Sequence, residues 1–332
     1  MITVDVLDPR VDPEPPDWAG FVAAQQLLAP WDYGLLAVES AGGPRPVLLA
    51  LVRRDRVVLA ALTVLVARRG RGPRWVEVFQ QWISGVPGWV FAEGLDVVER
   101  KEILRAAERA LCRYVGLSCL GLVYWHLSPA DVPLVAGFGR FVRPAAGTAV
   151  LDNTFASTGE WLAALSRNRR ASLRKLRRQL AGDPNLVIRF EPARHDLDGA
   201  ELAAMLGAHQ DKYHRYRHDS RNPVTAEYLS ALVSRPDVRT MTYHDADGTL
   251  LAFSTLLDHP AHLLSQHFAA VPAGDGGRGH LYFDLYTHLV DHLVERGGKS
   301  LSVGRGMDEV KTRLGFRIEP LRLAIVPRVV AG

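Results

Sequence analysis

Hydrophobic and polar positions alternate with two different periods along the chain, and these separate strands from helices. Three runs rich in Val and Leu follow one another over residues 46–54, 56–69 and 74–84, with Arg, Asp, Gly and Pro between them. Such runs are typical of strands. Helical spacing follows over residues 97–115. The first half is therefore predicted to contain three strands and a helix, and then a strand, a short helix and a last strand over residues 119–151.

The second half repeats this order of elements. Its predicted strands, helix, strand, short helix and final strand cover residues 238–271, 281–297, 299–303, 307–315 and 316–326. Helices over residues 198–218 and 225–233 are additional elements. A repeat of this length predicts two copies of one mixed α/β domain, rather than a solenoid. We expect an N-terminal domain over residues 1–152 and a C-terminal domain over residues 153–332.

A strongly basic helix is predicted at the start of the second copy, over residues 165–180. Its leucines share one face at helical spacing, and most of its arginines lie on other faces. Arg169 is different, because it falls inside the apolar stripe. An inward-facing arginine needs an anionic partner, from the protein or from a ligand. The outer arginines form a solvated face or a surface that attracts an anionic partner.

Composition places limits on the function. The chain has 332 residues, 48% of them hydrophobic, and its net charge is only +4, so it can bury a core and lacks the large excess of a dedicated nucleic-acid binder. Two cysteines do not make a disulfide framework or a zinc site. The longest apolar run, Val57–Ala67, is too short to cross a bilayer, and the N-terminus lacks a signal-peptide pattern. We expect a soluble, cytoplasmic protein.

The order of elements resembles the GNAT superfamily of N-acetyltransferases in a tandem arrangement. The basic helix, the long polar helix after it and the ending "KTRLGF" are similar to the branch that includes Fem-type aminoacyltransferases and acyl-thioester-using relatives. The resemblance implies two tandem GNAT-like domains packed side by side. It also implies a reaction in the cleft between them and no permanently bound cofactor. Acyl-CoA or acyl-phosphopantetheine would be the co-substrate.

The resemblance places the donor's pyrophosphate on backbone amides at the start of a helix, within Ala269–Phe283. The residues implied to bind it are Gly276, Gly277, Arg278, Gly279 and His280. The family pattern begins with Arg or Gln, and Gly274 stands there instead. A glycine-rich turn without a ligand would have the same sequence, so this alternative stays open.

Lys311 stands where similar enzymes hold an acid or an oxyanion-stabilising group, and an ammonium suits that task electrostatically. Its counterpart in the first copy is Ala136, which implies a catalytically degenerate first domain. His267 is a candidate general base, because histidine side chains titrate near neutral pH, and Gln266 on the opposite face of the same strand could only hydrogen-bond. A surface lysine and a structural histidine are the alternatives.

Cations and tyrosines alternate over residues 212–218, which suits a wall that contacts an anionic substrate or donor. Tyr213 and Arg217 in this segment, and Arg169 in the basic helix, are the candidates for contact with a charged substrate or donor. The histidine pairs at residues 214 and 218 and at residues 288 and 292 have zinc-like spacing. Neither has a glutamate in the HExxH position or an obvious third ligand, so no metal is predicted.

Three functions fit these features. The first is N-acyl transfer from acyl-CoA or an acidic acyl carrier protein, docked on the basic helix, to an amine. The second is Fem-like transfer of an aminoacyl group from charged tRNA. The third is a non-catalytic binding module. The sequence identifies neither the acyl chain nor the acceptor.

Overall fold

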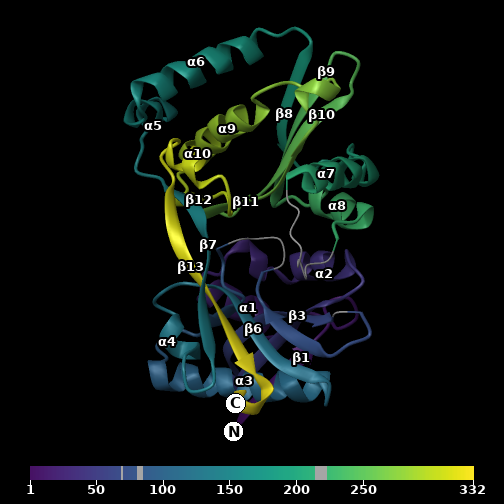
Figure 1. Ribbon diagram of the computed structural model, residues 1–332, viewed down its shortest axis with the longest axis vertical. Coiled ribbons are helices and arrows are strands. Elements are labelled where there is room, and N and C mark those ends of the chain that lie inside the picture. Colours follow the sequence, from purple (N-terminus) through teal and green to yellow (C-terminus); the bar gives the residue numbers. More distant parts are fainter. Residues whose placement is uncertain (69, 81–84, 214–222) are drawn as a thin grey trace. The chain divides into compact units, whose positions relative to one another are not determined.

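The computed structural model describes residues 1–68, 70–80, 85–213 and 223–332, and the chain forms two compact units (Figure 1). Unit 1 is built from Met1–Gly147 and Glu319–Gly332. Unit 2 is built from Thr148–Asp219 and Val224–Ile318. Each unit is a mixed sheet covered by helices, which confirms the predicted mixed α/β class.

The sheet of unit 1 has the order β1-β2-β3-β4-β6-β13, with β5 beside β3. Neighbouring strands are antiparallel, except that β4 and β6 are parallel. The strands are β1 (Ile2–Leu7), β2 (Val47–Arg54), β3 (Val57–Arg68), β4 (Arg74–Val78), β5 (Trp89–Phe91), β6 (Cys119–Leu127) and β13 (Arg317–Pro327).

Helices cover both faces of this sheet. They are α1 (Trp18–Ala24), α2 (Tyr33–Ala41), α3 (Val97–Val115) and α4 (Val132–Val135), with short 3-10 turns at Ala29–Trp31 and Arg328–Val330. Alternate residues of β2 enter different cores: Leu48 packs with the residues of α3, and Leu49 packs with those of α1 and α2. The continuous apolar run of β2 follows from this burial on both faces.

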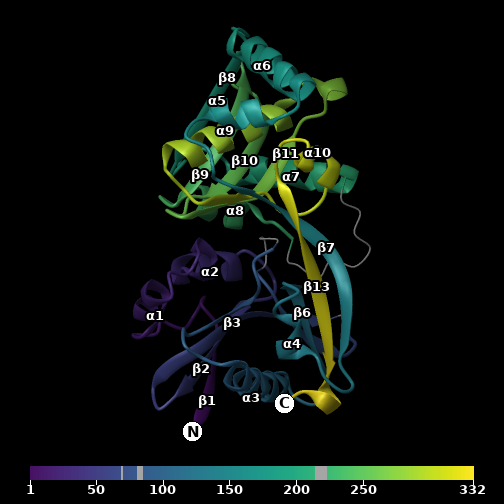
Figure 2. The ribbon, with the colours of Figure 1, turned by 90° about the vertical axis from the view of Figure 1, so that its left-hand side faces the viewer.

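The sheet of unit 2 has the order β7-β12-β11-β10-β9-β8, and only β11 and β12 are parallel. Its strands are β7 (Phe141–Asp152), β8 (Leu186–Pro192), β9 (Val238–Asp245), β10 (Leu250–Leu257), β11 (His262–Ala270) and β12 (Ser300–Ser302). The helices are α5 (Thr158–Ala164), α6 (Arg167–Ala181), α7 (Gly199–Tyr213), α8 (Ala226–Val233), α9 (Leu281–Glu295) and α10 (Asp308–Thr312), with a 3-10 turn at Ala273–Asp275. Figures 1 and 2 show α6 and α9 on one side of this sheet, and α7 and α8 on the other.

The two units exchange their last strands. β13 ends the chain, yet it pairs with β6 of unit 1, for example Val326 with Leu122. The end of β7 comes from the first half, yet it pairs with β12 of unit 2, for example Leu151 with Leu301. Each sheet is therefore completed by a strand that is distant in the sequence. The division of the two copies at residues 152 and 153 stays a prediction about the repeat.

Within the described chain, every helix is too short or too polar to pass through a lipid bilayer.

Candidate active site

The parallel ladder between β11 and β12 is short. It ends at Leu264 and Ser302, although β11 continues along β10 to Ala270. The chain after β12 stays bonded to β7 instead, since the Ala149 N–H donates to the Gly304 carbonyl at 3.0 Å. The two strands therefore part after three residues. On this edge, the backbone groups of β11 beyond Leu264 lose their ladder partners in β12 and can pair with another molecule.

A β-bulge lies where the strands part. The register of β11 on β10 shifts between Ser265 and Phe268, so that Gln266 and His267 together face Thr255. A bulge leaves one extra residue unpaired and turns side chains away from the regular alternation, which is why bulges are frequent beside active sites. It sets the directions of two neighbouring polar side chains here.

Gln266 carries an unsatisfied buried amide. Both polar atoms of its side chain are buried, and neither has a hydrogen-bond partner in the described part of the chain. A buried amide without a partner costs about 1–3 kcal/mol. A bound ligand that supplies a carbonyl or an N–H would remove this cost.

His267 is buried against α8. Its Nε2 lies 3.1 Å from the Tyr228 hydroxyl, and the two rings meet edge to face. Its backbone is fixed as well: the N–H donates to Thr255 Oγ1, and the carbonyl accepts from Ser254 Oγ. The imidazole thus has a phenol as a proton-sharing neighbour, and the sequence contained no signal for Tyr228.

The glycine-rich turn precedes α9, as predicted. Gly276 adopts a left-handed conformation with φ of 93°, and a side chain on Gly277 would meet the Val271 carbonyl at 1.9 Å. These two glycines serve the turn itself. Gly279 differs, because a Cβ there would face open space. His280 also has a left-handed φ, 67°, which is strained for a residue with a side chain.

The N-terminus of α9 is open. No side chain in the described chain caps it, and its first backbone bond is donated by Phe283 to the His280 carbonyl. The amides before Phe283 and the helix dipole favour an anion at this end. The Phe268 ring beside the bulge packs 5.1 Å from that of Tyr282, which brings the first turn of α9 next to β11.

Two arginines flank this helix end. The Arg169 guanidinium lies over the Phe283 ring, 5.2 Å from its centroid. The inward-facing arginine thus contacts an aromatic face, where we expected an anion; a ring face attracts cations through its quadrupole. Arg278 Nε lies 3.6 Å from Asp183 Oδ2, which is an ion pair too long for a hydrogen bond.

Lys311 is buried on α10. Its Nζ donates to the carbonyl oxygens of Val303 (2.9 Å), Gly304 (3.0 Å) and Arg305 (3.2 Å), which follow β12. Burial lowers the pKa of Lys311 to about 8, and Asp308 opposes the shift. The ammonium therefore holds the chain that diverges from β11, and all three of its N–H groups are in use.

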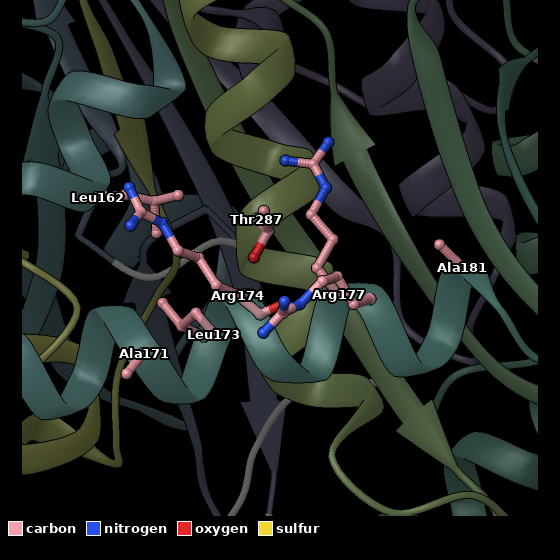
Figure 3. A pocket seen from close by; sticks show the side chains of 8 residues that line it. Leu162, Ala171, Leu173, Arg174, Arg177, Ala181 and Thr287 are labelled. Carbon is pink, nitrogen blue, oxygen red and sulfur yellow. The ribbon is translucent and has the colours of Figure 1, made fainter.

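A hollow of about 730 Å³ lies along the basic helix in unit 2. Figure 3 shows Arg174 and Arg177 reaching from α6 on either side of Thr287 in α9. Arg177 is bonded to Asp291 at 2.8 Å. The other lining residues are Leu162, Ala171, Leu173, Arg178 and Ala181. The leucines and alanines of this hollow can contact apolar groups of a partner, and its arginines can bind the partner's negative charges.

The remaining predicted residues add little to the description of the site. Tyr213 ends α7, but its side chain lies outside the description, as do Arg217 and the first histidine pair. In the second pair, His288 Nε2 lies 3.3 Å from Asp284, whereas His292 Nε2 lies 3.0 Å from Asp258. The two imidazoles thus face different carboxylates. No cluster of three metal-ligating side chains occurs among the residues that the structure describes.

One family model matches part of this chain, and several solved structures share its fold. Residues 167–312 match the model described as "Acetyltransferase (GNAT) domain". The C-terminal domain of a putative lysylphosphatidylglycerol synthetase from Agrobacterium fabrum is similar, with a TM-score of 0.60 and 15% identity over 93% of this chain and 90% of that one. FemX gives a TM-score of 0.59 and 11% identity, covering 93% and 95%.

A tandem GNAT protein from the clavulanic acid biosynthesis pathway matches with a TM-score of 0.56 and 14% identity, and the match covers 99% of each chain. A comparison with curated proteins finds no match. These findings confirm the predicted resemblance to the tandem GNAT and Fem-like branch and its two-domain arrangement. The fold supports a function of the N-acyltransferase type.

Proposed function

We propose that this protein moves an acyl group from a thioester to an amine, in unit 2, because residues 167–312 match the acetyltransferase (GNAT) domain model. The observation that carries the proposal is the buried, unpartnered Gln266 amide on the bulge where β11 leaves β12. A pantetheine-like donor is a chain of amides. It can pair with this side chain and with the edge of β11 that no longer pairs with β12.

The donor's phosphates would bind at the N-terminus of α9. The uncapped amides there attract anions, and Gly279 leaves room for close approach. Arg169 and Arg278 add positive charge at the same helix end, although the second is partly neutralised by Asp183. Acyl-CoA fits this arrangement, and so does the phosphopantetheine arm of an acyl carrier protein.

In the reaction, the amine nitrogen attacks the thioester carbonyl carbon and a C–N bond forms. The proton lost by the amine passes to His267, directly or through the Tyr228 hydroxyl. The carbonyl oxygen becomes an oxyanion, which the positive charge of Lys311 stabilises. The hydrogen bond from Lys311 Nζ to the Arg305 carbonyl is the longest of the three. If this bond breaks, one N–H of the ammonium can donate to the oxyanion instead. The C–S bond then breaks, and the thiolate takes up a proton.

An aminoacyl-tRNA is the second candidate donor. The observation in its favour is the exposed basic face of α6, where Arg174 and Arg178 rim the hollow beside α9. Closely spaced arginines bind a phosphate backbone as readily as an acidic carrier protein. The amide-forming step and its residues would be the same.

Intact-mass analysis of products tests the proposal. The protein would be incubated with a peptide-amine pool and separately with acyl-CoA thioesters, acyl carrier proteins and charged tRNAs. RNase would abolish only the tRNA-dependent product. We expect an acyl-mass increase with one donor class. No transfer from any donor would leave a binding module and contradict the proposal.

A matched pair of variants locates the site. Gln80 in unit 1, just after β4, also has a buried side chain whose polar atoms find no partner among the described residues. Gln266→Leu should reduce transfer about tenfold, because a hydrogen bond to the donor is lost. Gln80→Leu should leave it unchanged. The opposite result would place the reaction in unit 1.

A further inference from the structure

Large apolar side chains are exposed together on one part of unit 1. Leu117 and Val329 are 95% and 91% exposed, and Leu120 and Tyr114 are 57% and 55% exposed. Single exposed apolar residues are common, but a gathering of them marks a surface that contacts another molecule. We call these four residues the apolar patch.

Specific contacts hold the patch together. Arg328 Nη1 donates to the Gly116 carbonyl, and Pro327 pairs with Gly121, so the end of β13 places Val329 beside residues 116–121. Arg74 anchors the same segment from β4. Its backbone N–H donates to the Ser118 carbonyl at 3.0 Å, and its guanidinium donates to the Val115 carbonyl at 2.6 Å. These hydrogen bonds fix the backbone segments that carry the four apolar side chains.

Arginines surround the patch. Arg68 and Arg71 are exposed on the turn that leads to Arg74, and Arg113 is exposed one residue before Tyr114. One carboxylate close to Tyr114 is paired with an arginine. Asp8 pairs with Arg10 at 2.7 Å, and Arg10 interacts electrostatically with Tyr114.

Glu108 lies in the same helix as Tyr114 and is also neutralised. It is fully buried and pairs with Arg140 at 2.6 Å. Arg68, Arg71 and Arg113 therefore expose positive charge around the patch.

We propose that unit 1 docks on an anionic lipid bilayer through this patch. Apolar side chains enter the interface of the headgroups and acyl chains, while arginines bind lipid phosphates; the two contributions together give stable, reversible attachment. A protein partner would need a matching apolar surface, whereas an anionic bilayer complements both the apolar centre and the cationic rim. This inference does not depend on the proposed acyl transfer.

Vesicle co-sedimentation of the full chain tests the inference. Vesicles of phosphatidylcholine with phosphatidylglycerol should bind the protein, and vesicles of phosphatidylcholine alone should bind it at least tenfold more weakly. Leu117→Ser with Val329→Ser should weaken binding to the anionic vesicles about tenfold. Val57→Ser, at an exposed position at the start of β3, is the control and should bind like the wild type.

The basic helix α6 provides the decisive comparison, because its arginines also attract anionic lipids. Arg174→Gln with Arg178→Gln should retain most of the vesicle binding. The docking surface is wrong if that variant loses binding while the Leu117/Val329 variant keeps it, or if the wild type does not bind anionic vesicles at low salt. Thermal unfolding of each variant checks that the fold is intact.

Discussion

The long helices α3 of unit 1 and α9 of unit 2 begin differently. In unit 1, α3 has a full capping box: Asp96 accepts from the Glu99 N–H at 2.9 Å, and Glu99 accepts from the Asp96 N–H at 3.2 Å. In unit 2, α9 begins after glycines, and none of the side chains that the structure describes caps it. Carboxylates occupy the amides in the first case and would repel a phosphate. In the second case the amides stay available.

The parallel strand pairs, β4 with β6 in unit 1 and β11 with β12 in unit 2, also differ. The parallel ladder of unit 1 continues to the last residue of β4, Val78, opposite Tyr124, whereas that of unit 2 stops after three residues. Both units keep a buried glutamine, so that feature alone does not separate them. One fold thus supports a closed helix end in unit 1 and an open one in unit 2. This contrast supports our proposal that unit 2 carries the donor site and that unit 1 is degenerate.

The largest expected effect comes from Lys311. If its charge stabilises the transition state, Lys311→Met should lower kcat and kcat/KM alike, by about a hundredfold. The variant also leaves three loop carbonyls without their donor, so some loss of thermal stability should accompany it. Steady-state kinetics on the identified substrate pair measure the first effect. Lys299→Met, at an exposed position, is the control, and full turnover of Lys311→Met would move catalysis elsewhere.

Gly279→Asp would place a carboxylate at the open N-terminus of α9, as Asp96 and Glu99 do at the capped N-terminus of α3. The position has space for a side chain, so the fold should be unchanged. The new carboxylate should repel the donor's phosphates and raise the donor KM by roughly tenfold or more. Gly279→Ser, which adds bulk without charge, separates the two causes. An unchanged KM in Gly279→Asp would mean that phosphates bind elsewhere.

The pH dependence sharpens the assignment of Lys311. Burial lowers its pKa from 10.5 to about 8, so the ammonium is lost as the pH rises through 8. We expect kcat to fall above that pH by up to tenfold per unit. Stability should move in the opposite direction: between pH 8 and 10.5 the unfolded chain holds more protons, so the free energy of unfolding rises. Lys311→Arg keeps its charge and should remove the fall in kcat; a fall that persists belongs to another group.

The smallest effect on turnover is expected in unit 1. Asp96→Ala removes the capping box of α3 and should lower the free energy of unfolding by about 1 kcal/mol. Acyl transfer should be unchanged, because the helix end that it opens lies in the unit that we propose to be degenerate. Chemical denaturation and a turnover assay measure the two quantities. A tenfold change in donor KM would show that unit 1 also contacts the donor.

Elements with strong periodicity could be predicted from the sequence. The helix over residues 97–115 has the predicted limits, and the basic helix begins within two residues of its expected start. β1, α1, α2 and β8 were missed. β1 and β8 lie at sheet edges and expose alternate residues, and α1 and α2 are short, so their apolar signal is weak.

The candidate site divides in the same way. The glycine turn and Lys311 were found by local pattern, since a turn and a short helix are encoded by adjacent residues. The orphaned amide of Gln266 and the partnership of Tyr228 with His267 were not accessible, because they depend on a bulge and on a helix 39 residues away. The roles of Lys311 and His267 in catalysis stay predictions.

Local patterns predicted the repeated strands and helices and the basic face of α6, because periodicity and charge are properties of neighbouring residues. Which strand completes which sheet depends on contacts between segments that are distant along the chain. β13 pairs with β6 and β7 pairs with β12, and strand pairing between distant segments leaves no mark in local spacing. The same reason applies to the three carbonyls around Lys311: one Nζ collects them only after α10 has folded back on the chain that follows β12.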